Sequence, residues 1–283
     1  MRESIVLSAT AVSVKGISNL ENEGNFFLNG KSMAEIDMDS VRVTTDTQGS
    51  QFIYAICGNL GHRTNRKAAA SMMISELRNL QGKMTDSFMP ADRRAIQLKE
   101  SFENTQNAVN RMTVVKDAIE PDRTLFSSLA VYNDTAAVYT TGLGCVLLAR
   151  DGELNELDPM RSFSLKQGDT FLLCSYNVIK TVGADRLCDL MLAGTDTGLV
   201  AEALTADLTA HGIKTDILLL VVRISRINET EILRMESVTE DRDEVELHNN
   251  EGFSEKISKF YDKRQETLRT IVAAILTCVV AAA

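Results

Sequence analysis

Residues 51–80 read QFIYAICGNLGHRTNRKAAASMMISELRNL, and this stretch decides how the rest of the chain is interpreted. Residues 52–56 are a short apolar run rich in aromatic and β-branched side chains, which predicts a buried strand. A glycine-containing turn follows at residues 57–62, and the sequence from Asn65 onward favours a helix. Four apolar residues recur at spacings of four, three and four, as on one face of a helix: Met73, Leu77, Leu80 and Met84. We therefore predict a strand that turns sharply into an amphipathic helix.

The composition is that of a folded domain. The chain has 283 residues, of which 44% are hydrophobic and 24% charged, and this is enough for one domain of about 200–250 residues. Much of the net charge of −9 comes from residues 229–251, which contain nine acidic and two basic side chains. Because the remainder is close to neutral, the composition argues against a nucleic-acid-binding surface. The five cysteines include no C-x-x-C pair, which indicates buried thiols in a reducing compartment.

The C-terminal segment differs from the rest of the chain. Residues 270–283 form a run of 14 residues without a charged side chain, shorter than the about 20 residues of a spanning helix. A group of basic residues precedes the run, as on the cytoplasmic side of a membrane segment: Lys256, Lys259, Lys263, Arg264 and Arg269. We expect a membrane anchor, truncated at the chain end, that holds the domain at the cytoplasmic face of the cell membrane. A packed C-terminal helix is the alternative.

The remaining patterns divide the chain into one domain and a tail. Strands are expected at residues 4–14, 124–132, 136–140 and 216–224, a hairpin with a D-G turn at residues 141–154, and helices within residues 90–120 and around residues 201–208. Many strands with two long helical regions indicate an α+β layered architecture. We assign residues 1–228 to the domain, residues 229–267 to an acidic and then basic linker, and residues 268–283 to the apolar segment.

Several short motifs occur together, in one order. Residues 57–62 read C-G-N-L-G-H, and residues 16–28 contain N-E-G followed by a strand-like N-F-F-L. Residues 141–154 end in R-D-G-E-L, and residues 168–178 read G-D-T-F-L-L-C-S-Y-N-V. Together these segments resemble the PP2C-type (PPM) metal-dependent protein Ser/Thr phosphatases over roughly residues 1–226. The resemblance implies a PP2C-like αββα sandwich of two antiparallel sheets flanked by helices.

The same resemblance implies a site for two Mn²⁺ or Mg²⁺ ions, and here the chain departs from the family. The family motif D-G-x-G-G-H begins with a metal-bridging Asp, and S-D-G and D-N-x-T contribute further ligands. Position by position, the family's ligand shell falls on Glu23, Gly24, Cys57, the Gly58 carbonyl, Tyr176 and Thr215, with Asp216 beside it. Only one of the five carboxylates remains, and Asn19 stands where the family has its phosphate-binding Arg.

We therefore predict a pseudophosphatase with no catalytic residue, no intact metal site and no cofactor. Neutral side chains cannot offset the charge of two divalent cations, and a thiol is a poor ligand for hard ions. The expected role is a protein-binding or regulatory module, tethered to the membrane, whose partner is a phosphoprotein or a kinase-pathway component. An active phosphatase with relocated ligands, such as Asp216 and Glu23, is the alternative. Cysteine-based catalysis by Cys57 with His62, and a soft-metal or redox role of Cys57, are further options.

Overall fold

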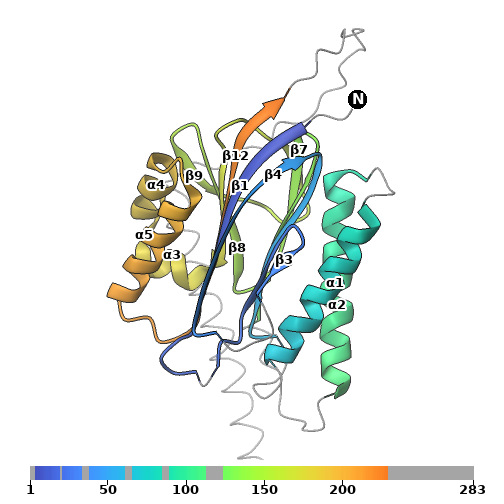
Figure 1. Cartoon of the computed structure of the whole chain (residues 1–283), viewed down its shortest axis with the longest axis vertical. Coiled ribbons are helices and arrows are strands. Elements are labelled where there is room, and N and C mark those ends of the chain that lie inside the picture. The colour runs from blue at the N-terminus through green and yellow to red at the C-terminus, as the bar shows by residue number, and fades with distance from the viewer. Residues whose placement is uncertain are drawn as a thin grey trace, which may run out of the picture. The chain divides into compact units, whose positions relative to one another are not determined.

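The computed structural model describes residues 4–19, 21–33, 38–60, 66–84, 89–112 and 124–228. These residues form two six-stranded sheets and five helices (Figure 1). The strands of the first sheet are, in chain order, β1 (Ser4–Val14), β4 (Ser40–Gly49), β8 (Gly144–Arg150), β9 (Glu153–Glu156), β11 (Thr170–Ser175) and β12 (Ile217–Asn228). Those of the second are β2 (Asn25–Leu28), β3 (Lys31–Ser32), β5 (Gln51–Gly58), β6 (Leu125–Tyr132), β7 (Thr135–Gly142) and β10 (Ser162–Ser164).

Both sheets are antiparallel throughout the pairs that the structure describes. The first has the order β4-β1-β12-β11-β8-β9 and the second β10-β7-β6-β5-β2-β3. The longest pairing joins β1 to β12, from Ser4 opposite Asn228 to Val14 opposite Ile217. It therefore brings the first and the last described strands of the chain side by side in the middle of one sheet.

Helices cover the outer face of each sheet (Figure 1). α1 (Arg66–Met84) and α2 (Ala91–Met112) contact β5, β6 and β7 of the second sheet. α3 (Tyr176–Val182), α4 (Ala184–Ala193) and α5 (Thr197–Ala210) lie on the first, where α5 contacts β1 and β12. The predicted α+β sandwich of two antiparallel sheets flanked by helices is confirmed.

The strand and the helix predicted within residues 51–80 are both present. β5 is buried from Phe52 to Gly58, as its apolar composition requires. α1 places Met73, Leu77 and Leu80 in one apolar cluster with side chains of β5. The strand therefore packs one face on this helix and turns the other toward the first sheet.

Other elements differ from the sequence prediction in extent. α2 ends at Met112, and residues 113–120 of the expected helix lie outside the described residues. β11 ends at Ser175, and Tyr176 begins α3. β3, β4, β10, α3 and α4 were not predicted, whereas β12 continues to Asn228, four residues beyond the predicted 224.

None of the helices that the structure describes is both long and apolar enough to cross a membrane. The predicted linker at residues 229–267 and the apolar segment at residues 268–283 lie outside the described residues.

Candidate functional site

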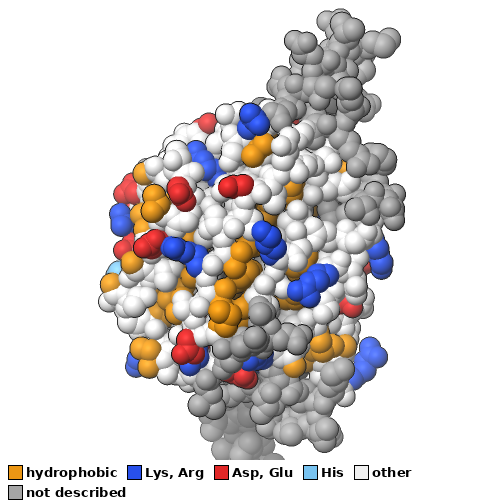
Figure 2. All heavy atoms as spheres, in the orientation of Figure 1, with side chains coloured by type: hydrophobic (Ala, Val, Ile, Leu, Met, Phe, Trp, Pro, Cys, Tyr) orange, Lys and Arg blue, Asp and Glu red, His pale blue; other side chains and the backbone are white. Residues whose placement is uncertain are grey.

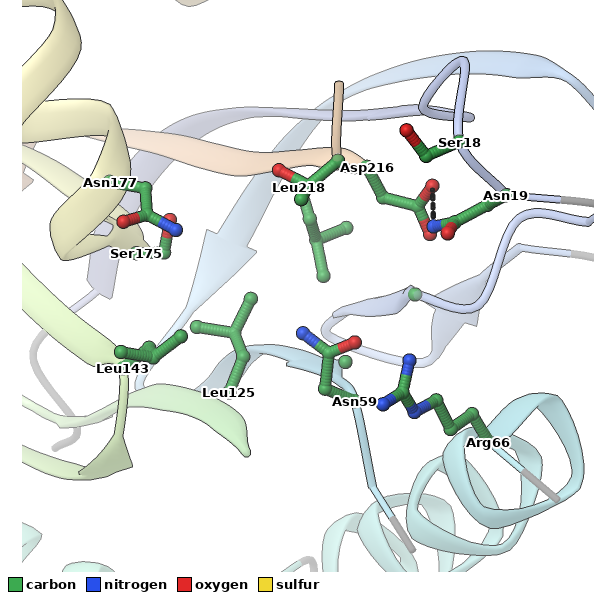
Figure 3. Close-up of a pocket in the computed structure, with 13 residues that line it drawn as sticks. Ser18, Asn19, Asn59, Arg66, Leu125, Leu143, Ser175, Asn177, Asp216 and Leu218 are labelled. Atoms are coloured by element: carbon green, nitrogen blue, oxygen red, sulfur yellow. Dashed lines mark hydrogen bonds between the residues drawn. The ribbon is translucent and has the colours of Figure 1, made fainter. Parts of the chain in front are cut away.

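A cavity of about 530 Å³ opens where strand ends of both sheets meet (Figure 3). Six segments contribute to it: the loop after β1, the end of β5, the start of β6, the β7–β8 turn, the β11–α3 junction and the segment before and into β12. Its lining residues are Ser18, Asn19, Gly24, Gly58, Asn59, Arg66, Leu125, Leu143, Ser175, Asn177, Thr215, Asp216 and Leu218. Five of the positions predicted from the resemblance line this cavity: Asn19, Gly24, Gly58, Thr215 and Asp216.

The carboxylate of Asp216 binds the loop between β1 and β2. Its Oδ1 accepts hydrogen bonds from the Gly16 backbone N–H at 2.7 Å and from Nδ2 of Asn19 at 2.8 Å. Its Oδ2 accepts one from the Glu23 backbone N–H at 2.9 Å. Figure 3 shows the Asp216 side chain turned toward Asn19. Three donors thus occupy both oxygens of this carboxylate, which anchors the loop that carries residues 16–23.

Gly16 is part of the same anchor, because its backbone lies directly on the segment before β12. A Cβ at this position would come within 2.3 Å of the Thr215 carbonyl carbon and 2.4 Å of the Lys214 carbonyl oxygen. Only a residue without a side chain allows the two backbones to approach this closely.

Glu23, the one carboxylate retained from the family pattern, is paired inside the protein. Its Oε2 accepts a hydrogen bond from Nη1 of Arg66 at 2.8 Å. Only 11% of the Glu23 side chain and 21% of the Arg66 side chain is exposed. The negative charge of Glu23 is therefore balanced by a guanidinium that itself lines the cavity.

Leucine side chains fill the space between the two glycines of the predicted metal site. A Cβ at Gly24 would lie 3.0 Å from Cδ2 of Leu218. A Cβ at Gly58 would lie 3.6 Å from Cδ2 of Leu125 and 3.7 Å from Cδ2 of Leu218. Both leucines are buried, and Figure 3 shows them between the polar residues on either side of the cavity. The middle of the cavity is therefore apolar.

Cys57 does not line the cavity. Its thiol is fully buried in the cluster that β5 forms with α1, where it donates toward the Asn25 carbonyl at 3.6 Å and the Ala70 carbonyl at 3.9 Å. Burial raises the pKa of the Cys57 thiol to about 12. A neutral, enclosed thiol is a poor nucleophile and a poor metal ligand, and His62, its suggested partner, lies outside the described residues.

Tyr176 is also absent from the cavity lining. It is the first residue of α3, and its hydroxyl donates a hydrogen bond to Oε1 of Glu156 in β9. Burial first, and then the neighbouring Glu156 carboxylate, raise the pKa of the Tyr176 hydroxyl well above its usual range. The side chain therefore stays neutral and joins α3 to the edge strand of the first sheet.

These residues do not fit a pair of divalent cations. Among the residues that the structure describes, no group of three His, Cys, Asp or Glu side chains is placed to hold a metal ion. The charged side chains of the lining are Arg66 and Asp216, one of each sign. A binuclear centre needs several hard oxygen ligands with excess negative charge, and this lining supplies neither.

Sequence reasoning missed the residues that give the cavity its character. Arg66, Asn59 and the leucines at 125, 143 and 218 were not singled out, although each lies within or next to a motif that was quoted. Replacement was a signal for two of them: Leu143 stands where the resembled family has an acid, and Leu218 stands at the last position of its D-N-x-T motif.

Comparison with known proteins supports the fold. No protein-family model matches the chain, and no curated protein sequence matches it. Solved structures do: PppA, a regulatory component of the type VI secretion system of Pseudomonas aeruginosa, aligns with a TM-score of 0.55 at 17% identity over 78% of this chain and 99% of its own. The Ser/Thr phosphatase PstP of Mycobacterium tuberculosis aligns with a TM-score of 0.57 at 15% identity over 78% and 100%. The PP2C domain of SpoIIE from Bacillus subtilis aligns with a TM-score of 0.53 at 15% identity over 81% and 66%. The chain therefore has the fold of the PP2C-type Ser/Thr phosphatases.

Proposed function

We propose that this PP2C-like domain is a pseudophosphatase, which hydrolyses no phosphate ester and acts as a protein-binding or regulatory module. The observation that carries the proposal is the packing of Leu218 and Leu125 against Gly24 and Gly58. Leucine methyl groups offer no ligand to a cation and no hydrogen-bond partner to a metal-bound water.

The charges around the cavity support the same proposal. Asp216 is held by three donors and Glu23 by Arg66. A Mn²⁺ ion bound by either carboxylate would compete with these donors, and the guanidinium of Arg66 would repel the ion. An active phosphatase with relocated ligands would have to overcome both effects and would need acids from elsewhere in the chain.

Calorimetric titration of the full chain with Mn²⁺, run beside an assay with p-nitrophenyl phosphate, tests the proposal. We expect neither micromolar metal binding nor metal-dependent turnover. Glu23→Gln and Asp216→Asn are the matched variants, because each removes one carboxylate charge with little change in side-chain shape. Metal binding and turnover in the wild type that both variants lose would establish the relocated-ligand phosphatase and overturn the pseudophosphatase.

We further propose that the partner is a phosphoprotein or a kinase-pathway component. Arg66, Asn19 and Asn59 line the cavity and offer donors for an anionic group beside an apolar centre. PppA is a regulatory component and SpoIIE a cell fate determinant in their own organisms, so regulation is a known use of this fold. Fluorescence anisotropy with a phosphoserine peptide and its unphosphorylated twin measures the preference, and we expect Arg66→Gln to remove it. Equal binding of the two peptides would contradict a phosphoprotein partner.

The location we propose is the cytoplasmic face of the cell membrane, with residues 270–283 as the anchor. Support comes from the absence of charge in that segment and from the basic residues that precede it. Deletion of residues 268–283 should move the protein from the membrane fraction to the supernatant. Unchanged fractionation of the deleted chain would refute the anchor.

A further inference from the structure

β4 is a long strand at the edge of a sheet. Each sheet has two edge strands, and the other three are short: β9 has 4 residues, β10 has 3 and β3 has 2. β4 has 10 residues, and in the part of the chain that the structure describes it pairs with β1 alone. Short edge strands are a common protection against unwanted pairing, and β4 does not have this protection.

Apart from two charged residues, β4 shows little of the other usual protection of an edge in the part of the chain that the structure describes. Its sequence, SVRVTTDTQG, contains no proline and no lysine, and its pairing with β1 runs from Val14 opposite Ser40 to Ile5 opposite Gly49 without a shift in register. Val41 and Val43 are only half-buried. Figure 2 shows apolar side chains between charged ones near the middle of the face on which β1 and β4 run in Figure 1. The strand is therefore regular in its pairing and only partly buried.

The two charged residues of β4 make the strand complementary to itself. Arg42 and Asp46 lie on the same face of the strand, two positions before and two after Thr44. Both are exposed. If two copies of β4 pair antiparallel with Thr44 opposite Thr44, Arg42 of each copy lies opposite Asp46 of the other.

We propose that two copies of this chain associate through β4, antiparallel about a two-fold axis at Thr44, so that their first sheets become one continuous sheet. The same register places Val43 opposite Thr45 and Val41 opposite Thr47 on the inner face, and such β-branched pairs are favourable between antiparallel strands. Registers centred on Arg42 or Asp46 would place like charges opposite each other. Registers centred on Val43 or Thr45 would leave both charges without an opposite partner.

The present contact of Arg42 does not oppose this arrangement. Nη1 of Arg42 lies 2.8 Å from Oε2 of Glu202 in α5, and more than half of each side chain is exposed. An exposed ion pair of this kind contributes little to stability. The guanidinium can therefore bind Asp46 of a second copy at small cost, either in addition to Glu202 or in its place.

Sedimentation equilibrium of the full chain in mild detergent tests the proposal, with three variants: Arg42→Asp, Asp46→Arg and the double exchange. Each single variant turns two attractive cross-strand pairs into two repulsive ones, which should raise the dimer dissociation constant by about ten- to a hundred-fold. The double exchange restores both attractive pairs and should restore the dimer. A mixture of the two single variants should form a heterodimer, because every facing pair in it is again of opposite charge.

Glu202→Gln is the matched control, since it removes the charge beside Arg42 within one copy and leaves β4 unchanged. It should not weaken the dimer, and circular dichroism melting curves should be alike for all variants. Association through residues 270–283 would be the same in every variant and would not follow the charge pattern. A monomeric wild type, or single variants that dimerise as well as the double exchange, would overturn the proposal.

Discussion

The Asp216→Asn variant tests whether the Asp216 carboxylate has a structural role or is a metal ligand. The structure gives this carboxylate three donors, two on Oδ1 and one on Oδ2. Asn keeps one carbonyl oxygen, so it can still accept from Gly16 and Asn19, but its amide group then faces the Glu23 backbone N–H, donor against donor. The charge that strengthens the remaining two hydrogen bonds is also lost.

The size of the effect follows from these contacts. Hydrogen bonds to a charged group contribute about 1.5–3 kcal/mol each, and an unsatisfied buried N–H costs about 1–3 kcal/mol. Asp216 is only half-buried, so screening by solvent reduces the sum. We expect Asp216→Asn to lower the free energy of unfolding by about 2 kcal/mol, which corresponds to a fall of about 4–8 °C in Tm for a domain of this size.

Urea unfolding followed by far-UV circular dichroism, with and without Mn²⁺, measures this difference. Asp189→Asn is the control, because Asp189 is an exposed acid on α4 and undergoes the same change of charge. If Asp216 were a metal ligand, the result would be the opposite. Without Mn²⁺ the variant would be at least as stable as the wild type, because the repulsion between ligand carboxylates would be reduced. With Mn²⁺ the wild type would gain stability that the variant lacks. An Asp216→Asn variant at least as stable as the wild type, together with Mn²⁺-dependent stabilisation of the wild type alone, would refute the reasoning.

Three further predictions concern the surroundings of the cavity. Gly16→Ala should destabilise the domain by about 3 kcal/mol or more in urea unfolding, because its Cβ would meet the Thr215 backbone at 2.3 Å; a variant as stable as the wild type would contradict the close approach. Leu218→Ala should cost about 2–4 kcal/mol in the same assay and, by calorimetry, should not create Mn²⁺ binding. Burial raises the pKa of the Cys57 thiol from 9.0 to about 12. Above pH 9 the unfolded chain therefore loses this proton before the folded chain does. The free energy of unfolding, measured with urea at a series of pH values, should fall as the pH rises toward 12, by up to about 1.4 kcal/mol per pH unit from this group. In the Cys57→Ala variant the free energy of unfolding should fall less steeply with rising pH, and an unchanged slope would exclude Cys57 as its source.

The sequence predicted those elements whose local pattern agrees with their environment. β5 and α1 follow from an apolar run and a helical stripe, and the burial of Met73 and Leu77 confirms the helix face. β4 could not be predicted in this way, because on an edge strand most side chains are at least partly exposed and the apolar alternation is reduced to Val41 and Val43. α3 was missed because a helix of 7 residues is too short to show a periodic pattern.

The site shows the limit of reading motifs position by position. The aligned motifs placed Gly24 and Gly58 at the site, but the leucines that pack on them come from β6 and β12, far away in sequence. The role of Asp216 depends on donors about 200 residues away, at Gly16 and Asn19, and no local pattern encodes such a contact. Cys57 occupies the motif position of a ligand, yet the alternation of side chains along β5 turns its thiol toward α1.

The replacements around the cavity also bear on stability. Carboxylates gathered around an absent metal repel one another, so a chain that never binds the metal would carry their cost without compensation. In this chain the two acids at or beside the motif positions are each held by donors of the protein itself, Glu23 by Arg66 and Asp216 by the loop of residues 16–23. Leu125 and Leu218 bury apolar surface in the same region, and such burial is favourable. The side chains around the cavity thus contribute to folding through contacts within the protein. Substitutions here should therefore be tested first in unfolding experiments and then in assays of activity.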